Sequence, residues 1–254
     1  MFIGSGGLAH SLISVKIADG VEALKERALW MPDEGLLAVA DLHLGYEGVL
    51  RREGVVIPRR QKAVIMDVLE RLVLEHSPQT VLVNGDFKHD FSRNLDEEWY
   101  EVKEVLRFLK EKVRLVIVRG NHDNYLPNIL RDMGIELRKS YKVGNYVFTH
   151  GHWDIKTRSS VVIGHEHPSL KLRDGIGAVL SVPAFVVGED FIVMPAFSPL
   201  ALGSDVSSYP YLSPVLRKRE MKDAKVFGAD EREGVLDFGT VSGLRSLDAS
   251  LLLK

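Results

Sequence analysis

The run Leu115-Val116-Ile117-Val118 is short, apolar and β-branched, and it leads into the polar segment Gly120-Asn121-His122-Asp123. Similar strand-length runs recur along the chain, each ending in small or polar residues before a loop or an amphipathic segment. They cover residues 36–40, 81–83, 146–148, 161–163, 185–187 and 191–193. This repeated pattern predicts an α/β protein whose early strands are buried on both faces.

Two segments between these runs have helical periodicity. Apolar residues share one face of residues 60–76 and of residues 96–112, which predicts two amphipathic helices packed on a sheet. After Gly175 this periodicity fades, and short runs separated by Gly and Pro predict a more antiparallel sheet in the second half.

Composition places the chain among ordinary globular proteins. Of its 254 residues, 45% are hydrophobic and 27% are charged, and no apolar run is long enough to span a bilayer. Residues 1–20 do not have the pattern of a secretory signal, so we expect a cytoplasmic protein that does not enter the membrane. We expect one domain over residues 1–254, with a core at 36–194 and a peripheral segment of surface strands and loops at 205–254.

Polar clusters follow five of the apolar runs. In open α/β sheets, the loops beyond the carboxyl ends of the strands converge on one crevice, so these clusters predict one shared site. The clusters are Asp41-Leu42-His43, Gly85-Asp86, Gly120-Asn121-His122-Asp123, His150-Gly151-His152 and Gly164-His165-Glu166-His167. The glycines indicate tight turns that need unusual backbone dihedrals.

The chemistry of these clusters points to a metal site without sulfur. The chain has no cysteine, and seven of its nine histidines lie in these segments or at His89 close by. Imidazole and carboxylate together suit Mn, Fe, Zn or Ni. Side chains two residues apart in an extended segment lie on the same side, so both can bind one ion. The formal net charge of −2 gives no global attraction to nucleic acid.

The ordered motifs Asp-x-His, Gly-Asp, Gly-Asn-His-Asp, His and Gly-His-x-His resemble the calcineurin-like metallophosphoesterase superfamily over residues 36–194. Within it, the stretches 41–47 and 85–90 are similar to archaeal SbcD-related phosphoesterases. The resemblance implies a four-layer αββα sandwich of two mixed β-sheets flanked by helices.

The same resemblance implies a binuclear centre with two divalent ions, of which Mn is the expected metal and Fe, Ni or Zn are alternatives. Such a pair activates water for in-line attack on a phosphoester. The implied ligands are Asp41, His43 and His167 for the first metal, Asn121, His150 and His165 for the second, and Asp86 as a bridge between them.

Other residues near the motifs have implied or open roles. His122 would face the substrate and protonate the leaving oxygen, and His89 would contact the phosphate. His152 either lines the substrate pocket or supports a neighbouring ligand. Asp123 and Asp90 each either orient a catalytic imidazole or cap a turn.

The expected function is metal-dependent hydrolysis of a phosphoester, with a phosphodiester as the favoured substrate. One alternative is a nuclease acting on DNA or RNA, although only about 60 residues follow Met194, where the related nucleases add a DNA-binding region. Another is a non-catalytic protein-interaction scaffold on the same fold. A metal hydrolase acting on an amide or a carboxylic ester is disfavoured, because an Asn ligand beside a substrate-facing His better matches phosphoesterase chemistry.

Overall fold

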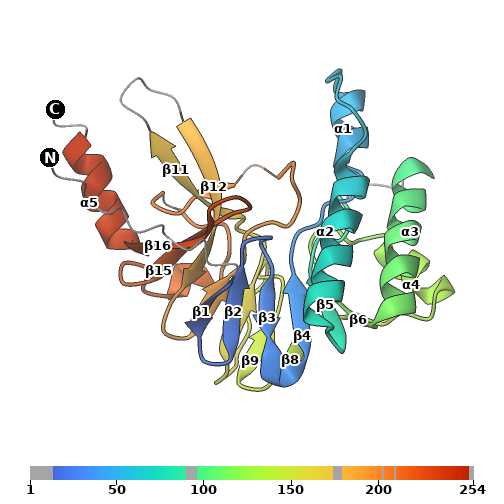
Figure 1. Cartoon of the computed structure of the whole chain (residues 1–254), viewed down its shortest axis with the longest axis horizontal. Helices are drawn as coiled ribbons and strands as arrows, with labels where there is room; N and C mark the ends of the chain where they lie inside the picture. The colour runs from blue at the N-terminus through green and yellow to red at the C-terminus, as the bar shows by residue number, and fades with distance from the viewer. Residues whose placement is uncertain (1–13, 90–95, 174–178, 202, 209, 252–254) are drawn as a thin grey trace, which may run out of the picture.

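Two mixed β-sheets pack face to face and carry helices on their outer sides (Figure 1). The structure is a computed structural model that describes residues 14–89, 96–173, 179–201, 203–208 and 210–251. The arrangement confirms the expected α/β class and the two flanked, mixed sheets.

The first sheet has seven strands, whose spatial order follows the chain. They are β1 (Ser14–Ala18), β2 (Val21–Leu24), β3 (Leu29–Met31), β4 (Leu36–Val39), β5 (Thr80–Asn84), β6 (Arg114–Val118) and β7 (Leu137–Arg138). Pairing is antiparallel from β1 to β4 and parallel from β4 to β7. We did not predict the first three strands, although Asp19-Gly20 between alternating apolar residues is a hairpin signal.

Helices cover the outer face of the first sheet. They are α2 (Gln61–His76), α3 (Asp96–Lys112) and α4 (Leu126–Asp132). The short helix α1 (Tyr46–Arg52) follows β4 and buries only Glu47, and a single 3-10 turn, η1 (Pro32–Glu34), precedes β4. Ile65, Leu69 and Leu72 of α2 pack with Leu106 of α3 in a core against the sheet. The two helices predicted from periodicity are therefore confirmed, because their apolar faces cover the strands.

The second sheet combines parallel and antiparallel pairs. Its strands are β8 (Tyr141–Val143), β9 (Tyr146–Phe148), β10 (Ser160–Ile163), β11 (Pro168–Arg173), β12 (Val179–Val187), β13 (Phe191–Val193), β14 (Ser204–Asp205), β15 (Lys225–Asp230) and β16 (Gly234–Thr240). β10 is parallel to β9 and β13, whereas β12 is antiparallel to β11, β13 and β15. Ala38 and Leu82 of the first sheet meet Phe148 and Phe185 of the second in the core between the sheets.

The expectation of a peripheral segment from residue 205 onward is wrong. β15 pairs with β12 from Ala184↔Gly228 to Val187↔Lys225, so this segment extends the second sheet. Two buried valines cover the outer face of that sheet. Val215 precedes the 3-10 turn η2 (Leu216–Lys218), and Val241 is the first residue of α5 (Val241–Leu251). The error has a physical cause: charged residues flank each short apolar run here, and burial comes from pairing with distant strands.

None of the helices in the described part of the chain has the length and apolar character needed to cross a bilayer.

Candidate metal centre

The polar clusters meet where the strands of both sheets end. Asp41, Asp86 and Asn121 follow the parallel strands β4, β5 and β6, and His150 and His165 follow the parallel strands β9 and β10. Backbone hydrogen bonds tie these loops together: the N–H of His43 donates to the carbonyl of Asp86 at 2.9 Å, and that of Gly164 donates to the carbonyl of His150 at 3.1 Å. Parallel pairing therefore produces the convergence expected from the sequence.

Asp41, His43 and His167 form one compact donor group. Each offers a ligand atom within 4.8 Å of the others. Nε2 of His167 lies 3.2 Å from Nε2 of His43 and 3.4 Å from Oδ1 of Asp41. The resemblance assigns these three residues to the first metal, and none of them to the second.

Asp86, His150 and His165 form a second donor group of the same size. Nε2 of His150 lies 3.2 Å from Oδ2 of Asp86 and 2.9 Å from Oδ1 of Asn121. The amide oxygen of Asn121 thus points to the same place as the imidazole and the carboxylate. This group brings together the residues that the resemblance assigns to the second metal.

Asp86 lies between the two donor groups. Its Oδ2 is 3.9 Å from Nε2 of His43 in the first group and 3.2 Å from Nε2 of His150 in the second. Its Oδ1 accepts a hydrogen bond of 2.9 Å from the backbone N–H of His122. The carboxylate is therefore fixed on one side by the chain and directed on the other toward both groups.

His89 and His122 lie together at the open side of the centre. Their rings stack at 5.3 Å between centroids, and both could join His43 around a metal ion. The Nδ1–H of His122 donates to the carbonyl of His89, which leaves Nε2 of His122 3.9 Å from Asp86. Tyr46, which sequence reasoning missed, stacks on His89 at 3.8 Å.

His152 lies beside the second donor group. Its ring centroid is 5.1 Å from that of His150 and 3.9 Å from that of Trp153. Nδ1 of His152 is buried and has no hydrogen-bond partner within the residues that the structure describes. Burial, together with the charge of His150, lowers the pKa of His152 to about 4, so the ring is a neutral group at this edge.

Backbone strain is concentrated at the candidate ligands. Positive φ angles occur at Asp41 (58°), His43 (48°), Asp86 (46°), His165 (66°) and His167 (46°), five of the seven non-glycine residues with such angles in the described chain. A non-glycine residue in this region costs about 1–2 kcal/mol. Strain held at one cluster of polar side chains is a mark of a functional site, because the surrounding structure must maintain it.

Glycines allow the loops to approach the carboxylates closely. A Cβ atom on Gly120 would lie 2.0 Å from Oδ1 of Asp86, and one on Gly164 would lie 2.4 Å from Oδ2 of Asp41. Unusual dihedrals explain Gly85 and Gly151, whose φ angles are 92° and 105°. At Gly120 and Gly164 the expected reason is therefore wrong, because the requirement there is space next to the acidic side chains.

The protonation states of Asp86, His43 and His165 suit a cation. Burial alone would raise the pKa of Asp86, but His150, His43 and His122 outweigh it and hold this pKa well below its usual range. Burial lowers the pKa of His43 to about 3 and, with the charge of His150, that of His165 to about 4. Anionic carboxylates and neutral imidazoles are the forms that bind metal ions. The pKa values of His150 and His167 are raised instead, so these two rings must each lose a proton before they can bind a metal ion.

A buried oxygen in the first donor group supports this fit. Oδ1 of Asp41 has no hydrogen-bond partner among the described residues, although it faces His167 and His150 at 3.4 and 3.5 Å. Leaving a buried carboxylate oxygen without a partner costs free energy. A divalent cation held by Asp41, His43 and His167 would satisfy that oxygen, and nitrogen and oxygen donors alone suit Mn, Fe, Zn or Ni.

Residues that sequence reasoning missed hold the first loop in place. The side-chain N–H of buried Gln61 donates to the carbonyl of His43 at 2.9 Å and to Oγ of Ser198 at 3.0 Å. Buried Glu47 in turn accepts the backbone N–H groups of Arg60 and Gln61 at the start of α2. In the sequence, each is a polar residue at the start of a helix, which is typical of ordinary helix capping and does not indicate a role at the site.

The carboxylate of Asp123 is hydrogen-bonded to two backbone groups. Its carboxylate accepts the backbone N–H groups of Gly120 at 2.8 Å and Lys88 at 3.3 Å, so it holds the loop that carries Asn121. Burial, reinforced by the charge of Asp86, raises the pKa of Asp123 to about 7. Asp90, the other candidate for such a role, lies outside the described residues.

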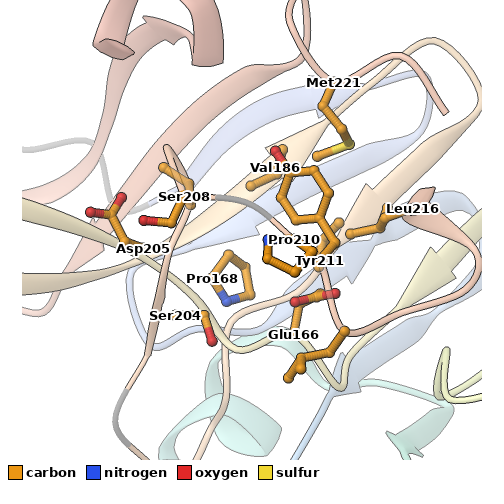
Figure 2. Close-up of a pocket in the computed structure, with 13 residues that line it drawn as sticks. Glu166, Pro168, Val186, Ser204, Asp205, Ser208, Pro210, Tyr211, Leu216 and Met221 are labelled. Carbon is orange, nitrogen blue, oxygen red and sulfur yellow. The ribbon is translucent and has the colours of Figure 1, made fainter. Parts of the chain in front are cut away.

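Glu166, between the ligand candidates His165 and His167, lines a cavity of about 150 Å³ on the far side of their loop. Figure 2 shows its carboxylate near Pro168, Tyr211 and Leu216. Oε1 of Glu166 accepts the backbone N–H of Ser213 at 2.6 Å, so this side chain ties the loop to the cover of the second sheet.

The metal-free protein should become less stable as the pH rises from 7 to 8.5, and the stabilisation by Mn²⁺ should grow over the same interval. Burial would lower the pKa of His150, but Asp86 and Asp41 raise it to about 9, above its ordinary 6.5. The stability linked to this proton is complete below pH 6.5 and is lost as the pH approaches 9. Bound metal competes with the same proton, so its binding strengthens with pH.

Thermal unfolding in EDTA and in excess Mn²⁺ measures this difference. As the pH rises, we expect the difference between the two melting temperatures to grow. Each kcal/mol of added stabilisation by the metal should widen it by about 2–4 °C. His150→Gln should make this difference in melting temperature less dependent on pH. A gap that is constant or narrows with pH in the wild type would contradict the prediction.

The family model for the calcineurin-like phosphoesterases matches residues 36–196, which is more than half of the chain. The chain therefore belongs to the calcineurin-like phosphoesterase family. No curated protein gives a significant match. The narrower likeness to SbcD-related phosphoesterases stays a prediction.

Two solved structures are similar to this chain. The nuclease MPE of Pseudomonas putida aligns with a TM-score of 0.67 and 20% identity, covering 89% of this chain and 98% of that chain. Yfce, a phosphoesterase from E. coli, aligns with a TM-score of 0.38 and 15% identity, covering 77% of this chain and 88% of that chain. The first likeness supports the fold.

Proposed function

We propose that this protein is a metal-dependent phosphodiesterase with a binuclear centre. The observation that carries the proposal is the position of Asp86, whose Oδ2 lies 3.9 Å from His43 in one donor group and 3.2 Å from His150 in the other. Asp41, His43 and His167 would hold one divalent ion, and Asn121, His150 and His165 would hold the other. Mn²⁺ is the favoured metal for this donor set.

When bound, two divalent ions would activate water and neutralise the phosphoryl oxygens. The chain itself supplies position and protons. His122 is 23% exposed at its side chain, against 2% for Asp86, so its ring faces the open side. Because Nδ1–H of His122 donates to the carbonyl of His89, Nε2 is the nitrogen that can deliver a proton to the leaving oxygen.

His89 is proposed to contact the non-bridging oxygens of the phosphate. Its ring is held between Tyr46 at 3.8 Å and His122 at 5.3 Å, and its Nδ1 lies 3.3 Å from Nδ1 of His43. This packing fixes the ring plane beside the first donor group. His152 would line the other end of the site, beside His150.

Metal-stripped protein assayed on bis(4-nitrophenyl) phosphate and on 4-nitrophenyl phosphate tests this function. We expect turnover only with an added divalent ion, highest with Mn²⁺, and a higher kcat/KM for the diester. Titration calorimetry should give two bound Mn²⁺ per chain.

The other outcomes are equally informative. Preference for the monoester would overturn the substrate class but leave the metal centre intact. No turnover with Mn²⁺, Fe²⁺, Ni²⁺ or Zn²⁺ would favour the non-catalytic scaffold. Faster hydrolysis of 4-nitrophenyl acetate than of either phosphate would point to a carboxylic ester hydrolase.

His122→Ala should lower the rate while both metals stay bound. A proton is needed most by poor leaving groups, so the loss should be about 10²–10⁴-fold for an alkyl phosphodiester and much smaller for a nitrophenyl ester. Steady-state kinetics on both substrates measures the difference. Equal losses on the two substrates would contradict the role of His122 as the acid.

Action on nucleic acid is a second candidate function. It is favoured by the likeness to a nuclease over 89% of this chain and by His89, which follows Asp86 as in the SbcD-like motif. Hydrolysis of single-stranded and duplex DNA and RNA, together with binding measured at several salt concentrations, tests it. Hydrolysis of bis(4-nitrophenyl) phosphate without cleavage of any oligonucleotide would exclude it.

A further inference from the structure

A second cavity, of about 300 Å³, opens beside the first donor group. Arg27, His167, Ser169 and Ser181 line it together with proline and small side chains such as Pro199 and Ala201. Its volume is at the lower end of small-molecule sites. His167 belongs to both the donor group and the cavity wall, so a ligand in this cavity would adjoin the metal centre.

Arg27 is built into this cavity by a turn between β2 and β3. The turn is closed by hydrogen bonds of 2.8 Å from Leu24 to Ala28 and 3.0 Å from Arg27 to Leu24, and the φ of Arg27 is 64°. The turn precedes residue 36, so it lies outside the segment matched to the family.

The guanidinium of Arg27 is held close to the metal ligands. The side chain of Arg27 is 12% exposed, and its Nη1 donates to the carbonyl of Ser198 at 3.3 Å. The backbone N–H of Ser198 donates in turn to the carbonyl of Asp41 at 3.2 Å. One residue therefore connects Arg27 to the first donor group.

The acidic partner of Arg27 could be replaced by a phosphate. Nη2 donates to Oε1 of Glu231 at 3.1 Å, and Glu231 is 54% exposed on the turn between β15 and β16. Glu26 adds a weaker attraction from the same turn as Arg27. Lys171, outside the lining, donates to the lining residue Ser181 at 2.8 Å and is a second cation next to it. The exposed Glu231 carboxylate, held by one hydrogen bond, can give way to a phosphate, which arginine also binds through its N–H groups.

We propose that this cavity is a second phosphate subsite, in which Arg27 binds a phosphate of the substrate other than the one at the metal centre. The substrate class is then a nucleotide phosphodiester that carries a neighbouring phosphate. The inference rests on the proposed phosphodiesterase function for its substrate, but the binding of the second phosphate can be measured without turnover. Proline and small side chains in the wall give the subsite a preformed shape.

Titration calorimetry with two thymidine dinucleotides tests the subsite. The probes are TpT and pTpT, which differ by one terminal phosphate, and they are added to the protein in EDTA at fixed ionic strength. We expect pTpT to bind at least about tenfold more tightly than TpT, the range of a charged hydrogen bond. Arg27→Gln should bring this ratio close to one, and Arg27→Lys should retain part of it.

Two further variants complete the test. Glu231→Gln removes the competing carboxylate and should raise the ratio of pTpT to TpT affinity. Arg219→Gln is the matched control, because Arg219 is 17% exposed and pairs with Asp190 at 2.8 Å, away from the cavity. It should leave the ratio unchanged.

Equal affinities of the wild type for the two probes would overturn the subsite, and so would a ratio that survives in Arg27→Gln. Neither result bears on hydrolysis of bis(4-nitrophenyl) phosphate, which has a single phosphate. Conversely, loss of turnover with an intact affinity ratio would overturn the proposed function alone.

Discussion

Asp86→Asn should abolish the joint metal centre and lower kcat/KM for bis(4-nitrophenyl) phosphate by more than 100-fold. An amide keeps the size of the side chain and can still accept the backbone N–H of His122, but it removes the negative charge between His43 and His150. Loss of a residue that only supports a ligand costs about 10- to 100-fold. A shared ligand should cost more, because both ions lose a donor.

Two readouts separate loss of metal from loss of fold. Titration calorimetry should show weaker or fewer Mn²⁺ ions bound, and the rise in melting temperature on adding Mn²⁺ should largely disappear. Asp67→Asn is the control, since Asp67 is 74% exposed and pairs with Arg71 on α2. Wild-type kcat/KM in Asp86→Asn would refute a bridging role for this carboxylate.

Gly120→Ala should have the second large effect, through one added methyl group. Its Cβ would lie 2.0 Å from Oδ1 and 2.2 Å from the backbone nitrogen of Asp86, so the loop or the carboxylate must move. Overpacking of this kind costs about 1–3 kcal/mol of stability. A displacement of about 1 Å at a reacting centre can cost about 100-fold in rate.

Gly243→Ala is the matched control for this substitution. Gly243 lies in α5, and its nearest neighbour to an added Cβ is Oγ1 of Thr240 at 3.3 Å. Alanine is favoured over glycine in a helix, and the contact with Thr240 needs a shift of only a few tenths of an ångström, so this variant should keep full activity and a stability close to that of the wild type. Melting temperatures, Mn²⁺ titration and kinetics compare the two variants. Full activity in Gly120→Ala would show that the close approach to Asp86 is not needed.

The local pattern of the sequence predicted most of the strands that carry the candidate ligands. β4, β5, β6, β9 and β10 are short β-branched runs, and each is followed by its polar cluster. Periods of two and about four residues are properties of neighbouring positions, so they can be seen without tertiary contacts. The α/β class and the helices 61–76 and 96–112 follow from the same local information.

The C-terminal strands show where this information ends. β15 and β16 contain few consecutive apolar residues, yet Val226 and Phe227 are buried because β15 pairs with β12. The same holds for Gln61, whose contacts with His43 and Ser198 span 18 and 137 residues of chain. No local pattern records such partners.

The sequence by itself determined the chemistry of the candidate centre: histidine, aspartate and asparagine donors at the ends of parallel strands, with no sulfur. Only the tertiary structure decided which donors share a group, why Gly120 and Gly164 must be glycine, and that Arg27 shares a cavity with His167. The physical reason is the range of the interactions. Residue types and periodicity are local, whereas distances between loops depend on how the two sheets pack.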